Sequence, residues 1–256
     1  MTRRLAAALL TISSVVLAGC IDLEQTLTLD RNMSGQAGFA MKFDLEGMAR
    51  MMAQMKRAME GKEGAPTQAE IDEVAKELQT SGTSTSSGDF EKQKAELATS
   101  LPAGVKLLGA SFEETGLRIA ANMSFGFDHV SKLKDISLPK KQAAGPAPGS
   151  PVDDPFGGLQ VTDEGQTVLI TSPVENPAGD SQSQMPPGAD PETMKQVEEM
   201  LKGLRVAFKI TSPLEIVEHN AHRKEGTTLI WEYDVKALQK LSPDQLKQGV
   251  RVRYRK

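Results

Sequence analysis

Alternating apolar and polar residues predict a sheet near the start of the chain. Over residues 22–30, leucines fall on one face, whereas acidic residues and threonines fall on the other. A period of two is typical of a half-buried strand. Turn-forming residues at 32–35 lead into a second alternation, of Phe39, Met41 and Phe43. The two segments therefore predict a β-hairpin.

The longest alternation in the chain lies over residues 117–127. Its apolar face consists of Leu117, Ile119, Ala121, Met123, Phe125 and Phe127. A strand of this length predicts a curved sheet that buries one face against another layer, most simply a helix.

Further periodic segments complete the predicted elements. Period-two alternation predicts strands over 105–113, 159–161, 167–171, 206–210, 214–217, 229–235 and 250–254. Helical periods and capping residues predict helices over 66–78, 89–101, 190–201 and 242–247. The fold class is therefore α+β: an antiparallel, curved, helix-grip-like sheet packed against helices, with long Pro/Gly-rich loops.

Methionines recur at helical spacing after the first hairpin. They are Met48, Met51, Met52, Met55 and Met59. Such a stripe fits a face turned to the protein core. It also fits an adaptable apolar wall for a lipid or peptide, because methionine is flexible and polarizable. A Cu(I) site is the third interpretation, which the lack of histidine in this segment disfavours.

Composition divides the chain into one body and several polar segments. Residues 45–101 form a helical insertion, and residues 80–88, 139–158 and 173–189 are rich in Gly, Pro or Ser and predict flexible loops. The short strands between the last two loops are too few to stand alone. We therefore expect one domain over residues 20–256, preceded by a separate segment, 1–19.

The first 20 residues have the pattern of an export signal. Two arginines precede an apolar run that is shorter than the about 20 residues a membrane span needs. The run ends in Leu-Ala-Gly-Cys, in which Cys20 is the single cysteine of the chain. This tetrapeptide resembles the lipobox of bacterial lipoproteins. The resemblance implies cleavage between Gly19 and Cys20 and acylation of the Cys20 sulfur; the alternative is a free thiol behind an ordinary signal peptide.

Acylation would decide where the protein resides. Two or more acyl chains hold a soluble domain at a bilayer. Ile21, not an acidic residue, follows Cys20. In lipoproteins of two-membrane bacteria this favours the periplasmic face of the outer membrane. In a cell with one membrane, the same anchor implies its extracellular face.

Charge and composition exclude some classes of partner. The formal net charge is −4, so the chain has no overall basic footprint for nucleic acid. The last strand carries Arg251, Arg253 and Arg255 on one face. These arginines fit a solvated edge strand, in which charge discourages edge pairing. They also fit a strip that contacts anionic headgroups.

Catalytic motifs are absent from the sequence. There is no nucleophile elbow, phosphate-binding loop, dinucleotide glycine pattern or His-Glu-x-x-His zinc motif. His219 and His222 have a spacing that shares a helix face, but their flanks predict a hairpin turn, so turn histidines are favoured over a metal site. We expect a non-catalytic protein without a cofactor.

Two segments resemble LppM-like envelope lipoproteins of bacteria. They are IDLEQTLTLDRNMSGQ, which follows Cys20, and HNAHRKEGTTLIWEYD, which contains Asn220, Gly226 and Trp231. Ala221 stands where the family has glycine, and the insertion 45–101 lies outside the resemblance. The resemblance implies a helix-grip-like sheet and binding of lipid or glycolipid at the envelope, and it carries over no catalytic residue.

Together these observations predict an envelope lipoprotein anchored by acyl chains on Cys20. Its expected ligand is a lipid, glycolipid or other amphiphile, and the methionine stripe is the candidate wall. The alternative is a structural partner in an envelope protein assembly, and an enzyme is the third possibility, which the missing motifs disfavour.

Overall fold

The computed structural model describes residues 21–62, 64–78, 87–136, 156–174 and 203–256. The elements in chain order are β1 (Ile21–Leu29), β2 (Gly35–Asp44), α1 (Leu45–Met59), α2 (Gln68–Leu78), α3 (Ser87–Ser100), β3 (Val105–Thr115), β4 (Arg118–Phe127), the 3-10 helix η2 (Val130–Asp135), β5 (Gln160–Asp163), β6 (Thr167–Ser172), β7 (Arg205–Thr211), β8 (Ile216–His219), β9 (Arg223–Glu225), β10 (Thr228–Asp234), α6 (Val235–Lys240), α7 (Pro243–Gln248) and β11 (Val250–Arg255).

A seven-stranded sheet, here called sheet A, forms the body of the molecule. Its strand order is β3-β4-β2-β1-β7-β10-β9, and it is antiparallel except where β1 pairs with β7. The predicted hairpin β1–β2 is confirmed, with Ile21 opposite Phe43. Gly35 closes its turn with a positive φ, and a Cβ at this position would overlap the carbonyl oxygen of Thr28. The strand that follows the N-terminal segment therefore lies in the interior of sheet A.

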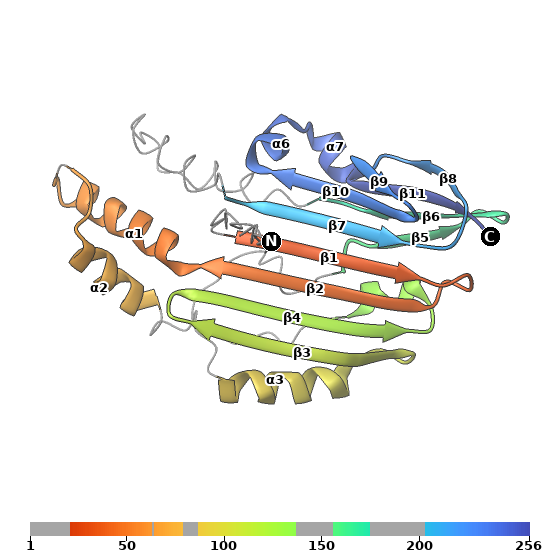
Figure 1. Cartoon of the computed structure of the whole chain (residues 1–256), viewed down its shortest axis with the longest axis horizontal. Coiled ribbons are helices and arrows are strands. Elements are labelled where there is room, and N and C mark those ends of the chain that lie inside the picture. Colours follow the sequence, from red (N-terminus) through yellow and green to blue (C-terminus); the bar gives the residue numbers. More distant parts are fainter. Residues whose placement is uncertain (1–20, 63, 79–86, 137–155, 175–202) are drawn as a thin grey trace, which may run out of the picture.

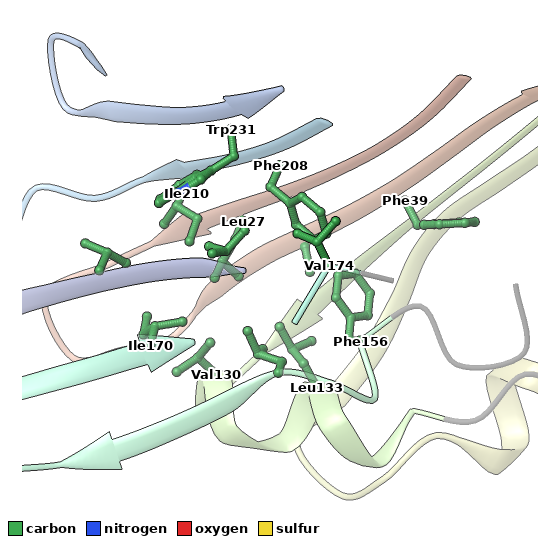
Figure 2. Packing of buried hydrophobic residues seen from close by; sticks show 14 of the residues in the cluster. Leu27, Phe39, Val130, Leu133, Phe156, Ile170, Val174, Phe208, Ile210 and Trp231 are labelled. Atoms are coloured by element: carbon green, nitrogen blue, oxygen red, sulfur yellow. The ribbon is translucent and has the colours of Figure 1, made fainter. Parts of the chain in front are cut away.

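A second sheet covers the inner face of sheet A. Sheet B has four strands in the order β5-β6-β11-β8. Figure 2 shows Leu27, Phe208 and Ile210 of sheet A facing Ile170 of sheet B, with Val130 of η2 beside them. The main core therefore lies between two sheets, and helices contribute a smaller share of the covering layer than the sequence suggests.

The α+β class and the alternating strands are confirmed, but two local expectations are wrong. Strand β11 is not an edge strand, because β6 and β8 pair with its two sides. The strand predicted over 229–235 ends at Asp234, whose carboxylate accepts the Ala237 N–H at 2.7 Å and so begins α6. In both places alternation identifies a strand but does not reveal its neighbours or its last residue.

The predicted loops fall mostly outside the described residues, as does the helix expected over 190–201. Their described margins are ordered. Ser87 begins α3. Phe156 and Val174 are buried in the main core, where the Phe156 ring packs edge-on against Phe125 at 6.1 Å between centroids. These residues attach both Pro/Gly-rich segments to the body.

Candidate functional site

The first residue of β1 and the start of the methionine helix lie at the same end of sheet A. Cys20 and Gly19 lie outside the described residues, but Ile21 is the first residue of β1. Because Ile21 pairs with Phe43, helix α1 begins two residues beyond this pair, at Leu45. The Leu45 N–H donates to the Leu117 carbonyl at 2.7 Å. We call this end of sheet A, where Ile21, Phe43 and Leu45 lie, the Ile21 end.

Helices α1 and α2 form a hairpin that extends beyond the Ile21 end (Figure 1). They have their own small core, separate from that between the sheets, and it consists of Ala49, Ala53, Ile71, Val74, Ala75 and Leu78. Alanine lets the two helices approach closely. Among the α1 side chains that the structure describes, Ala49 and Ala53 lie in this core.

Met52 is the one residue of the methionine stripe whose side chain the structure describes. It is 39% exposed, although Ala49 and Ala53 on the same helix are 0% and 1% exposed. The side chains of Met48, Met51, Met55 and Met59 lie outside the described part of α1. At Met52, the interpretation of the stripe as part of the protein core does not hold.

One carboxylate joins the two helices of the hairpin. Glu70 accepts hydrogen bonds from the Thr67 N–H at 2.7 Å and the Thr67 hydroxyl at 2.9 Å, and Arg57 Nη1 donates to both of its oxygens at 2.8 and 3.0 Å. The Thr67 backbone and hydroxyl donors, followed by Arg57, lower the pKa of Glu70 from 4.5 to about 2. The capping box predicted by Thr67 and Glu70 thus also holds α1 against α2.

A group of charged side chains links three strands near the Ile21 end. Arg205 of β7 donates to Asp22 at 2.8 Å, to Glu24 at 3.2 Å and to Glu232 at 2.7 Å, and Lys209 donates to Glu24 at 2.9 Å. Burial alone would raise the pKa of Glu24, but the Lys209 and Arg205 donors lower it below its usual range. The sequence shows these charged residues but does not show that they contact one another. The contacts depend on the pairing of β1 with β7, which are far apart in the sequence.

The three C-terminal arginines are engaged by glutamates. Arg251 and Arg253 contact Glu218, Arg253 also donates to Glu164 at 2.8 Å, and Arg255 donates to Glu215 at 2.7 Å. Strand β11 runs toward the end of the molecule opposite α1 (Figure 1). The predicted headgroup contact therefore concerns a charge-compensated strip far from the expected anchor.

His219 and His222 lie where the chain crosses from β8 of sheet B to β9 of sheet A, and this segment is here called the sheet crossing. His219 Nδ1 accepts the Ala221 N–H at 3.1 Å, and His222 Nδ1 accepts the Glu232 N–H at 3.1 Å. Within the described ranges no group of three or more His, Cys, Asp or Glu residues could hold a metal ion. The expected hairpin turn is misplaced: both histidines lie in or beside the segment that joins β8 of sheet B to β9 of sheet A, and the hairpin turn lies at 226–227, between β9 and β10.

Asn220 is the central polar residue of that crossing. Its side-chain oxygen accepts hydrogen bonds from the Trp231 indole at 2.7 Å and the Arg251 N–H at 2.8 Å, and its amide donates to the Gly249 carbonyl at 2.7 Å. Asn220 and Trp231 are two of the residues that carry the family resemblance, which implies no role for either. Their contact depends on the tertiary structure.

Comparisons with solved structures found distant structural neighbours. No protein-family model and no curated protein matches the chain. The chain is similar to the NMR structure of the folded domain of Mycobacterium tuberculosis LppM, with 10% identity and a TM-score of 0.42, over 93% of this chain and 90% of that one. This neighbour bears the name of the family that the two terminal segments resemble, but identity and score at this level do not establish a shared family. In the part of the chain that the structure describes, no helix could cross a bilayer.

Proposed function

We propose that the protein is a lipid-anchored, non-catalytic envelope protein that binds a lipid or another amphiphile along helix α1. The observation that carries this proposal is the exposure of Met52 on a helix in which the described residues Ala49 and Ala53 are buried. Met52 is not one of the buried residues in the core between α1 and α2. A thioether side chain adapts to ligands of irregular shape.

The position of α1 supports the same proposal. Cys20, the expected site of acylation, directly precedes β1, and α1 begins next to the pair formed by Ile21 and Phe43. Acyl chains on Cys20 place this end of the protein at a membrane, on its exported side. An amphiphile leaving that membrane reaches α1 first.

Uptake of a fluorescent fatty acid tests this function. The mature chain with Cys20→Ser cannot be acylated and carries no acyl chain of its own. We expect saturable uptake by this protein and its loss when Met51, Met52 and Met55 are all changed to glutamine, which has a similar length and helix propensity. The measurement is fluorescence titration of the dye.

The matched control is Val217→Gln. Val217 on β8 is another exposed large apolar residue, at 44%, and we expect this variant to take up the dye as the Cys20→Ser protein does. Equal uptake by the methionine variant would remove α1 from the site. No saturable uptake by the Cys20→Ser protein would contradict amphiphile binding and favour the envelope-scaffold alternative.

A further inference from the structure

We infer that the Ile21 end rests directly on the bilayer surface, with the Met52 side of α1 among the lipid headgroups and upper acyl chains. The contact is apolar and does not use basic residues. This inference rests on the proposed acylation of Cys20 and goes beyond ligand binding, because it assigns the orientation of the whole molecule on the membrane.

The first step of the argument is the length of the tether. One residue spans at most about 3.6 Å, and Ile21, which follows Cys20, already pairs with Phe43 in sheet A. Strand β1 is held on both sides, by nine paired positions with β2 and seven with β7. The body therefore cannot move away from the membrane on a flexible linker.

The second step is what lies beside the anchor. Helix α1 begins at Leu45, and the α1–α2 hairpin extends beyond this end of sheet A (Figure 1). Leu45 is buried, and its N–H donates a hydrogen bond to the Leu117 carbonyl. The hairpin is therefore attached to sheet A at the Ile21 end, next to the expected anchor. Met52, about two turns along α1, is the exposed large apolar residue that the structure describes there.

The third step is the charge of the hairpin. Four of its five cations lie close to carboxylates: Arg50 to Glu46 at 3.3 Å, Lys56 to Glu73 at 3.5 Å, Arg57 to Glu70 at 2.8 Å and Lys62 to Glu60 at 2.6 Å. A surface that binds anionic headgroups needs an excess of cations, and the hairpin does not present one. Apolar side chains therefore make the contact with the bilayer. Salt does not screen the free energy of burying them, in contrast to the attraction between charges.

A single reporter cysteine tests the orientation. Because Cys20 is the one cysteine of the chain and its thiol is consumed by acylation, Met52→Cys creates a unique site for an environment-sensitive dye. The acylated mature protein is reconstituted in phosphatidylcholine vesicles that contain a nitroxide-labelled lipid. Val217→Cys, which replaces another exposed residue on β8, is the matched control.

We expect a blue shift and nitroxide quenching of the dye at position 52, equal at low and high salt, and neither effect at position 217. Equal exposure of both dyes to water would overturn the inference. A signal that appears only with anionic lipid and disappears at high salt would also overturn it, in favour of an electrostatic contact.

Mass spectrometry of the mature N-terminal peptide separates this inference from the proposed function. An unacylated Cys20 would refute the lipid anchor, and the inferred orientation would fail with it. An acylated Cys20 with a water-exposed dye at position 52 would refute the orientation alone. A result of no fatty-acid uptake by the Cys20→Ser protein would contradict ligand binding, but it would not change what the dye at position 52 reports about orientation.

Discussion

At the scale of single residues, Asn220 has the largest structural role of the polar side chains at the sheet crossing. It lies between β8 of sheet B and β9 of sheet A, and it joins β10, through Trp231, to the segment at the start of β11, through Gly249 and Arg251. The Trp231 side chain is fully buried. A buried N–H without an acceptor costs the full desolvation energy of that group.

Asn220→Ala removes the acceptor of the Trp231 indole and the Arg251 N–H. We expect it to lower the free energy of unfolding by about 2 to 3 kcal/mol, measured by urea denaturation. The control is Asn122→Ala on β4, whose amide bonds an exposed Ser111 hydroxyl at 3.3 Å, and which should change stability by less than about 0.5 kcal/mol. Equal effects of the two substitutions would mean that Asn220 does not stabilise the crossing.

At the scale of elements, the α1–α2 hairpin is a unit with its own core and its own polar link. Its buried residues do not belong to the cluster between the sheets. Glu70 both begins α2, through Thr67, and holds α1, through Arg57. The stability of this hairpin should therefore respond to the protonation of one carboxyl group.

Acid should loosen the hairpin through Glu70. The Thr67 donors and Arg57 hold the pKa of Glu70 at about 2 in the folded protein, whereas its ordinary value is 4.5. A lowered pKa adds stability that is complete above 4.5 and is lost as the pH falls toward 2. The protection factors of the α1 and α2 amides, which compare each exchange rate with the intrinsic rate at the same pH, should fall across this range as the carboxyl becomes protonated.

Glu70→Gln should exchange faster at neutral pH and respond less to acid. Glu73→Gln changes another carboxylate of α2, which contacts the exposed Lys56 at 3.5 Å, and should behave as the natural protein does. An unchanged acid response in Glu70→Gln would assign the effect to other groups.

At the scale of the whole molecule, segments that are far apart in the sequence pair in the middle of sheet A. Strand β1 pairs in parallel with β7, and Arg205 links residues at opposite ends of the sequence, Asp22 and Glu232. The strand next to the expected anchor is thus held by backbone and side-chain contacts. Any force on the anchor acts on an interior strand.

Arg205→Met leaves three carboxylates near the Ile21 end without their shared cation. Because the Arg205 side chain is 34% exposed, we expect a loss of about 1 kcal/mol at low salt, and a smaller loss at high salt. Arg255→Met breaks a single pair that is more exposed and should have no measurable effect. Chemical denaturation at two salt concentrations makes the comparison; a salt-independent loss would point to packing of the arginine stem instead.

Local patterns predicted the elements well where one face of a segment meets the core. The alternation over 117–127 corresponds to β4, and the short helix predicted over 242–247 corresponds to α7, because burial periodicity and helix signals depend on neighbours in sequence. The methionine stripe correctly predicted a helix at α1. It did not predict that Ala49 and Ala53 would be buried while Met52 is exposed, since the partner helix decides which face of α1 is covered.

The sequence by itself determined the α+β class, a lone cysteine and a first strand directly after it, and it predicts an export signal before that cysteine. These properties follow from hydrophobic period, turn chemistry and position along the chain. Tertiary structure decided that two sheets face each other, that β11 lies inside its sheet and that Arg205, Asp22 and Glu232 meet. Such contacts depend on strand pairing between distant segments, and many pairings satisfy the same alternation. Packing of the complete core selects one of them.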